Sequence, residues 1–165
     1  MSRVIDAASP DARDRLSAAL GIARWVDEVA AGSPYASLDV LVDAGERAAA
    51  DLTDAELDEA VGHHPRIGER AAGEGASSRL SAGEQAGLGR NDEGVDAAIA
   101  RGNEVYEERF GRVFLIRAAG RSRQEVLDEL QRRLKNDDAA ETAEAKDQLR
   151  QIAALRLRAL FGEDA

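Results

Sequence analysis

The chain has 165 residues, no cysteine, and 32 acidic against 22 basic residues, which gives a formal net charge of -10. This length fits one domain with a sizeable core, and the absence of cysteine excludes a disulfide framework, a thiolate nucleophile and the usual structural zinc sites. The negative charge argues against a nucleic-acid partner, because phosphate binding calls for a basic patch.

The elements expected in chain order are helices, because no run alternates apolar and polar residues long enough for a sheet. Ser9-Pro10 is typical of an N-cap followed by proline at the first helical position, and it begins a helix that ends near Gly21. A second helix runs to about Gly32, and a third begins near Ser37. Residues 53–56, Thr-Asp-Ala-Glu, form a capping box that starts a short fourth helix.

The fourth helix is expected to end at two adjacent histidines, His63 and His64. Pro65 biases His64 away from helical geometry, so His64 should lie at a helix-to-loop junction. The following residues, 68–81, are rich in Gly, Ala and Ser. Such a loop is either mobile or held by a ligand.

A fifth helix should begin at Ser81, and a long one should cover about 91–110 and stop at Gly111. Residues 113–116, Val-Phe-Leu-Ile, are interpreted as extended buried chain without a true strand. A capping box at 122–125 opens a helix to about Lys135.

Asn136 is expected as the C-cap of that helix, and the last helix should span about 139–161. The predicted fold is an all-α, single-domain bundle of seven or eight helices over residues 1–165, with no significant sheet.

No apolar run approaches the ~20 residues that span a bilayer, and the N-terminus lacks the basic-then-apolar pattern of a signal peptide. We therefore expect a cytoplasmic protein without a membrane partner. Its heavy use of Ala, Arg, Asp and Gly points to a bacterial source.

The paired histidines are the main candidates for acid-base chemistry near neutral pH. Two histidines at a helix end also interact favourably with the helix dipole without any chemistry. Zinc fits less well, because adjacent residues point in different directions and no further His or Cys completes a site. The favoured interpretation is one acid-base group, His64, whose backbone is made rigid by Pro65.

The last helix places Arg156 on an apolar stripe. At about 100° per residue, Leu149, Ile152, Ala153 and Leu160 share its face, whereas Arg158 lies roughly opposite. A guanidinium aimed at the core must be paired. Either Arg156 binds an acidic side chain of the fold, the commoner case, or it awaits an anionic ligand.

Glu84 presents a similar choice. Ser81-Ala82-Gly83-Glu84 matches a capping box, in which the glutamate reaches back to the helix start. Glu84 and Gln85 also follow the loop that begins at the histidines, so they can instead project into the same cavity.

Taken together, four segments resemble the OHCU decarboxylases, enzymes that act on 2-oxo-4-hydroxy-4-carboxy-5-ureidoimidazoline, the last unstable intermediate between urate and allantoin. The resemblance covers about residues 10 to 161. The segments that carry it are His64-Pro65-Arg66-Ile67-Gly68, Ser81 with Glu84-Gln85-Ala86-Gly87, residues 103–111 with Phe114, and Arg133-Leu134-Lys135-Asn136 followed by Glu141 and residues 152–157.

The resemblance implies an all-α fold, no cofactor, no metal, a small-molecule substrate and a homodimer. It puts the family's catalytic histidine on His64 and its glutamate on Glu84. Its substrate-binding groups fall on Pro65, Ser81, Gln85, the free backbone groups of Ile116, Arg117 and Ala118, and Arg156.

The function implied is decarboxylation to (S)-allantoin and CO2, with His64 moving protons. Many members carry different residues near Arg66 and Arg112, which leaves a decarboxylase or hydrolase of a related ureide or imidazolone open. A non-catalytic acidic helical interaction module is the alternative from another class.

Overall fold

The computed structural model describes residues 3–62, 64, 80 and 93–162. Seven helices lie in these ranges: α1 (Pro10–Ala19), α2 (Ala23–Ala31), α3 (Leu38–Ala48), α4 (Asp54–Val61), α6 (Glu93–Phe110), α7 (Arg123–Arg133) and α8 (Asp138–Phe161). The same ranges hold no strand, only an antiparallel bridge between Ile5 and Tyr35. The all-α prediction is confirmed, and the helix expected at Ser81 lies outside the described residues.

The chain's internal contacts group into two compact units. The first unit comprises Met1–Ala60 and Leu149–Ala165, and the second comprises Val61–Gln148. Helix α8 therefore gives its N-terminal part to the second unit and its C-terminal part to the first. The single-domain expectation stays a prediction.

Side-chain caps start α1, α3 and α4, and those at Ser9 and Thr53 were predicted, whereas α2 begins without a side-chain cap. The Ser9 hydroxyl accepts the Ala12 N–H at 3.2 Å, and the Ser37 hydroxyl accepts the Val40 N–H at 3.2 Å. At α4 the box is reciprocal, because Glu56 donates its N–H to Thr53 Oγ1 at 3.1 Å and Thr53 donates its own to Glu56 Oε1 at 3.0 Å. These bonds satisfy N–H groups that a helix start otherwise leaves unpaired.

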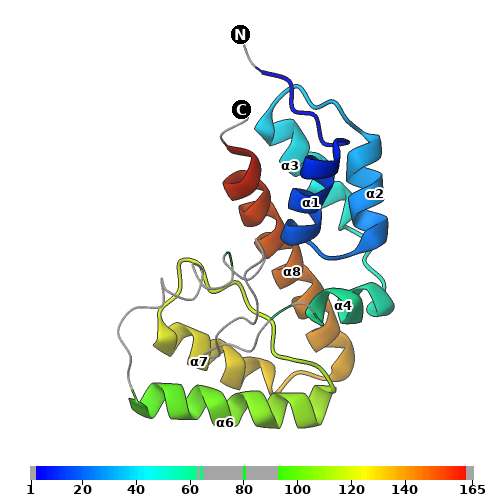
Figure 1. Ribbon diagram of the computed structural model, residues 1–165. Helices are drawn as coiled ribbons and strands as arrows, with labels where there is room; N and C mark the ends of the chain where they lie inside the picture. The colour runs from blue at the N-terminus through cyan, green and yellow to red at the C-terminus, as the bar shows by residue number, and fades with distance from the viewer. Residues whose placement is uncertain (1–2, 63, 65–79, 81–92, 163–165) are drawn as a thin grey trace. The chain divides into compact units, whose positions relative to one another are not determined.

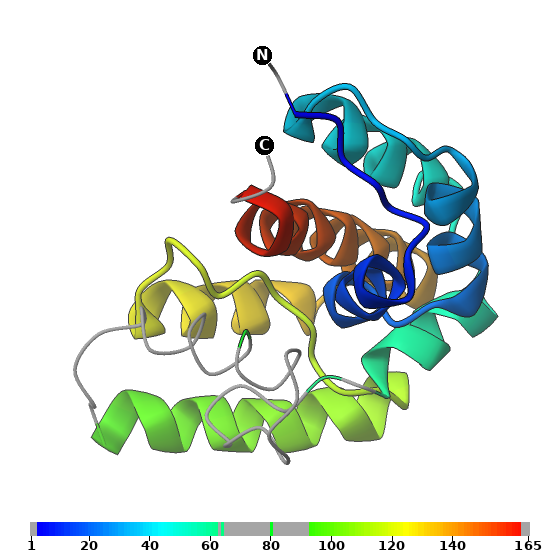
Figure 2. The same cartoon turned by 45° about the horizontal axis from the view of Figure 1, so that its top comes forward.

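The core of the first unit forms where α1, α2 and α3 surround the C-terminal part of α8 (Figures 1 and 2). The Trp25 indole N–H donates to the Gly45 carbonyl at 2.9 Å. A Cβ at position 45 would lie 2.7 Å from Leu157 Cδ1. Glycine therefore allows α3 to approach α8 closely at this point.

In the second unit, α6 and α7 lie side by side, and the chain from Gly111 to Ser122 returns past α7, in the direction opposite to α6, before α7 begins (Figures 1 and 2). Gly111 has a φ of 73°, a left-handed conformation that suits glycine, and it ends α6 as predicted. The buried core of this unit consists of Ile99, Tyr106, Phe114, Ile116, Ala118, Val126, Leu127 and Leu130.

Helix α7 ends earlier than its sequence predicts. Its last residue is Arg133 and its C-cap is Leu134, so the expectation of a C-cap at Asn136 is wrong. The Asn136 amide instead donates to Glu141 Oε2 at 3.1 Å and to Glu144 Oε2 at 2.9 Å. The backbone of Asn136 also lacks the left-handed conformation of a C-cap asparagine, because no described residue other than glycine has a positive φ.

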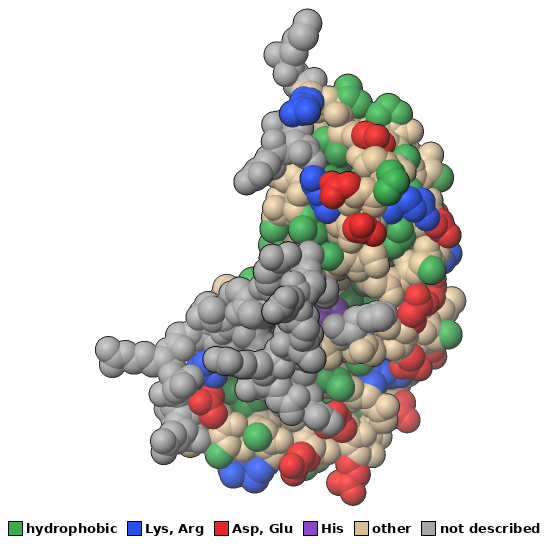
Figure 3. All heavy atoms as spheres, viewed as in Figure 1, with side chains coloured by type: hydrophobic (Ala, Val, Ile, Leu, Met, Phe, Trp, Pro, Cys, Tyr) green, Lys and Arg blue, Asp and Glu red, His purple; other side chains and the backbone are tan. Residues whose placement is uncertain are grey.

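Charges of both signs are interspersed on the face shown in Figure 3, where acidic and basic side chains alternate over short distances. Among the described residues, no helix is long and apolar enough to cross a membrane.

Candidate functional site

His64 lies directly after α4, at the helix-to-loop junction that Pro65 predicts. Its backbone N–H donates to the Val61 carbonyl at 3.0 Å, a tight final turn that fixes where the residue leaves the helix. The residue is half-buried, so its imidazole is partly withdrawn from water. A histidine in this setting can exchange protons with a bound molecule near neutral pH.

Four of the expected site residues lie outside the described part of the chain: Pro65, Ser81, Glu84 and Gln85. Arg66 lies outside it as well. The choice between a capping role and a pocket role for Glu84 stays a prediction.

Residues 114–118 have no regular secondary structure and are buried except for the half-buried Arg117. Over the predicted range of 113–116 the absence of a strand is confirmed, and Val113 is half-buried. Side chains from neighbouring elements hold the backbone of this segment. Arg133 Nη1 donates to the Leu115 carbonyl at 2.7 Å. The Arg117 N–H donates to Gln148 Oε1 at 2.9 Å, and the Arg117 carbonyl accepts from Arg121 Nε at 2.9 Å. The backbone of Arg117 is therefore not free, which corrects that part of the expectation.

Behind this segment lies a buried ion pair between Arg133 and Glu141, with side-chain exposures of 1% and 0%. Arg133 Nε donates to Glu141 Oε1 at 2.9 Å, and its Nη2 makes a second bond to the same carboxylate. The guanidinium also lies 4.6 Å from the centre of the Phe114 ring. Such a pair neutralises both charges and satisfies their hydrogen bonds, so it holds structure in place.

Tyr106 completes this cluster from α6. Its hydroxyl donates to Glu141 Oε1 at 2.6 Å, and its ring contacts Phe110 and Phe114. Burial, followed by the hydrogen bond to Glu141 and the charge of that carboxylate, raises the pKa of Tyr106 well above its ordinary value. The hydroxyl therefore stays protonated and remains a donor.

Sequence reasoning did not find the pairing of Arg133 with Glu141, although a usable signal exists. Val126, Leu130 and Arg133 fall at helical spacing on one face of α7, and all three are buried. The helical spacing that predicts the burial of Arg156 predicts the burial of Arg133 as well.

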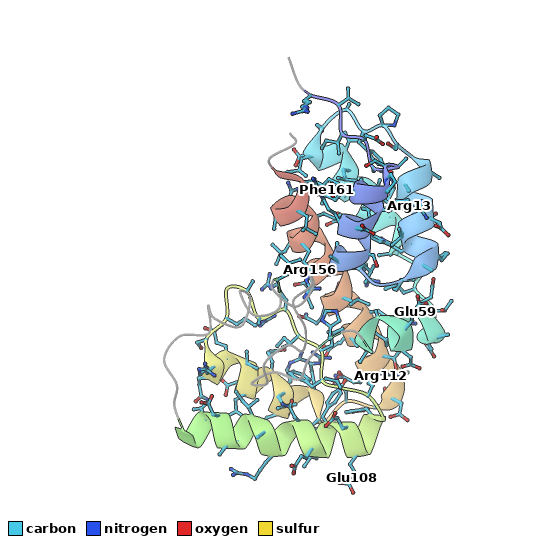
Figure 4. All side chains as sticks on the ribbon, in the orientation of Figure 1. Arg13, Glu59, Glu108, Arg112, Arg156 and Phe161 are labelled. Atoms are coloured by element: carbon cyan, nitrogen blue, oxygen red, sulfur yellow. The ribbon has the colours of Figure 1, made fainter. Side chains whose placement is uncertain are left out.

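Arg156 belongs to the first unit, where it is 2% exposed. Its Nη1 donates to the Ala18 carbonyl, the end of α1, at 3.1 Å. Figure 4 shows the side chain on α8 beside α1. Arg158, expected on the opposite face, is half exposed and pairs with Asp39 at 2.9 Å. The predicted placement of both arginines is confirmed.

Arg112, the other position of expected variation, donates from Nη1 to Thr142 Oγ1 at 3.3 Å. Within the described ranges, no three His, Cys, Asp or Glu side chains gather as a metal site requires.

Two solved structures share this fold. A crystal structure of OHCU decarboxylase in the presence of (S)-allantoin is 22% identical, with a TM-score of 0.77 over 90% of this chain and 98% of that one. A crystal structure of (S)-allantoin synthase is 15% identical, with a TM-score of 0.64 over 91% of this chain and 50% of that one. At these identities the likeness defines a class by fold alone, the all-α architecture that both enzymes use.

Comparison with related sequences identifies one family within this fold class. The chain belongs to the OHCU decarboxylase family, because the model of that family matches residues 6–158. A 2-oxo-4-hydroxy-4-carboxy-5-ureidoimidazoline decarboxylase of Haloferax volcanii is 30% identical over 141 residues, 85% of this chain and 83% of that protein. The enzyme of the same name from Amia calva is 39% identical over 97 residues, 58% of this chain and 55% of that protein.

Proposed function

We propose that this chain decarboxylates 2-oxo-4-hydroxy-4-carboxy-5-ureidoimidazoline to (S)-allantoin and CO2 in urate degradation. The observation that carries the proposal is membership of the OHCU decarboxylase family over residues 6–158. His64 at the end of α4 and the buried Arg156 support it, because both residue types suit an anionic substrate whose reaction needs a proton.

The reaction breaks the bond between a ring carbon and the carboxylate. The electron pair of that bond is taken up by the unsaturated ring with its carbonyl groups, and a proton then adds to a ring carbon. Because the substrate itself absorbs the electrons, the protein must supply orientation, stabilisation of the developing oxyanion, and a proton on one face. Unassisted decay would give racemic allantoin.

His64 is proposed to move these protons, assisting at the substrate hydroxyl and supplying the proton to carbon. Glu84 would hold the hydroxyl or the ureido N–H groups. Arg156 would anchor an anionic or carbonyl oxygen of the substrate. Pro65, Ser81, Gln85 and the segment from Ile116 to Ala118 would line and bind the ring and the ureido arm.

The test is to generate the unstable substrate in situ from urate with two upstream enzymes, add this protein, and follow allantoin by circular dichroism. We expect a faster reaction and one enantiomer of product. No gain in rate and no optical activity above the background would refute the proposed function.

The role of His64 has its own test. His64→Asn should lower kcat by ~10²–10⁴, the usual contribution of a general acid-base group, and should abolish enantioselectivity while the helical circular dichroism is kept. His63→Asn is the matched control, expected to stay near wild-type turnover. Near wild-type turnover in His64→Asn would remove His64 from the mechanism, and full activity in Glu84→Ala would favour the capping role of that glutamate.

A homodimer and a cytoplasmic, bacterial setting are also proposed, the first from the family resemblance and the second from composition. Light scattering after size-exclusion chromatography tests the dimer directly. A mass equal to one chain at micromolar concentration would contradict it.

A further inference from the structure

The segment between α6 and α7 gains one of its hydrogen bonds from α8. Gln148 lies in the part of α8 that belongs to the second unit, and its amide oxygen accepts the Arg117 N–H at 2.9 Å. A backbone N–H bonds only to an acceptor, so the oxygen of the amide faces the segment. The bond joins residues far apart in sequence, and it fixes the direction of a peptide group that no sheet partner holds.

A fixed direction of the Arg117 N–H also constrains the directions of the N–H groups of Ile116 and Ala118. Residues 113–118 form no helix, strand or turn. Where such a stretch is extended, successive N–H groups point to opposite sides, and those of Ile116 and Ala118 then share the side that the Arg117 N–H leaves. Both residues are buried, at 4% exposure each. Within the described part of the chain, neither N–H makes a hydrogen bond, and Arg117 Nε is buried without a hydrogen-bond partner there.

Buried donors of this kind are costly unless something accepts from them. The carbonyl and carboxylate oxygens of the proposed substrate are suitable acceptors, and a desolvated setting strengthens each bond that they accept.

We propose that Gln148 is a positioning residue of the substrate site: by holding the Arg117 N–H, it aims the amides of Ile116 and Ala118 at the oxygen atoms of the substrate. This inference rests on the proposed function. Gln148 itself neither touches the substrate nor moves a proton.

Two variants of one residue test the role. Gln148→Met has a side chain of similar length with no oxygen to accept the N–H, whereas Gln148→Glu keeps an acceptor oxygen in the same place. Gln124→Met is the matched control, because Gln124 is an exposed glutamine on α7 whose amide bonds only to Asp128 among the described residues.

We expect Gln148→Met to lower kcat/KM about tenfold, mainly through KM, as the loss of well-aimed hydrogen bonds does. Gln148→Glu should recover to within about threefold of wild type. Hydrogen exchange followed by NMR gives a second readout that needs no activity. The Arg117 amide should be protected in wild type and in Gln148→Glu, and should exchange faster in Gln148→Met.

Wild-type kcat/KM in Gln148→Met, or an Arg117 amide that stays protected in it, would overturn the positioning role. A Gln148→Glu variant as weak as Gln148→Met would do the same. If the wild-type chain forms no optically active allantoin, the proposed function fails and takes this inference with it. Failure of the proposed function can be told apart from failure of the positioning role, because it is seen with the wild-type chain alone.

Discussion

Each of the two compact units buries an arginine among its described residues, and the acceptors shown for the two arginines differ. In the second unit, Arg133 faces the carboxylate of Glu141, so two buried charges neutralise each other. In the first unit, one bond of Arg156 goes to the backbone carbonyl of Ala18, a neutral oxygen, and the residue also has further interactions. The same sequence pattern, an arginine on an apolar helix stripe, thus predicts that the side chain is buried but does not predict its partner. The partner determines whether the charge is neutralised within the fold or can bind a ligand.

Breaking the ion pair of the second unit should have the largest effect on stability. Arg133→Met leaves Glu141 as a buried, unpaired charge, which costs about 3–5 kcal/mol in the free energy of unfolding. Urea unfolding measures the loss. The double variant that adds Glu141→Leu should recover part of it, because no charge then remains buried although the Tyr106 hydroxyl loses its acceptor.

Arg158→Met is the matched control on α8, since that arginine is half exposed beside Asp39, and it should cost less than about 1 kcal/mol. An Arg133→Met variant as stable as this control would show that the buried pair contributes nothing.

The corresponding change in the first unit separates the two roles left open for Arg156. If Arg156 binds the substrate, Arg156→Met should lower kcat/KM by about 10–100-fold, since a charge-assisted hydrogen bond is worth ~1.5–3 kcal/mol. Stability should fall by less than in Arg133→Met. Steady-state kinetics and urea unfolding on the same preparation distinguish the substrate-binding role of Arg156 from an internal ion pair. A large loss of stability with kcat/KM retained would instead assign Arg156 to an internal ion pair.

Two buried tyrosines extend the comparison to neutral groups. Tyr106 donates to the Glu141 carboxylate at 2.6 Å, whereas Tyr35 donates to the Val29 carbonyl at 2.6 Å. Tyr106→Phe should cost about 2 kcal/mol and Tyr35→Phe about 1 kcal/mol, because hydrogen bonds to charged groups are the stronger ones. Thermal unfolding of both variants measures the difference. Equal losses would remove the distinction between the two acceptors.

The smallest effect is expected at a surface pair of the first unit. The hydrogen bond from Arg24 Nε to Glu56 at 2.6 Å, with further help from the Thr53 N–H, holds the pKa of Glu56 below its ordinary 4.5. This contribution to stability is present above pH 4.5 and is lost as the pH falls through the lowered folded-state pKa.

Glu56→Gln keeps an oxygen for the capping box and removes only the charge. It should cost about 0.5 kcal/mol at pH 7, and this cost should shrink as the pH falls through the lowered pKa of Glu56, because Glu56 then becomes protonated in the wild type as well. Urea unfolding at several pH values tests this. A cost that does not change with pH would contradict the assignment.

The helix starts were predictable because each cap joins residues that lie three apart in the chain. Ser9 and Thr53 make the bonds that their sequence motifs predict, and Ser37, predicted only as a helix start, makes one as well. Asn136 is not the C-cap, because the helix already ends at Leu134 and no described residue other than glycine has the positive φ that a C-cap asparagine adopts. A residue type that favours capping therefore does not by itself locate the end of a helix.

The site was predictable to a lesser extent. The junction position of His64 follows from the neighbouring proline, and the burial of Arg156 follows from helical spacing. The bonds from Arg133 to Leu115 and from Gln148 to Arg117 join residues whose approach depends on how α7 and α8 pack. Spacing within one helix carries no information about such contacts between elements.

Helix α8 has a consequence for synthesis on the ribosome. The first unit needs residues from Leu149 onward, yet its N-terminal portion ends at Ala60. The nascent chain must grow by about 90 residues after Ala60 before the part of α8 that completes this core is synthesised. At about 5–20 residues per second this takes roughly 5–20 s. Until then Leu157, which lies beside Trp25 where α3 approaches α8 at Gly45, is missing from this core. The helices of residues 10–60 thus depend on a helix that is translated about 90 residues later.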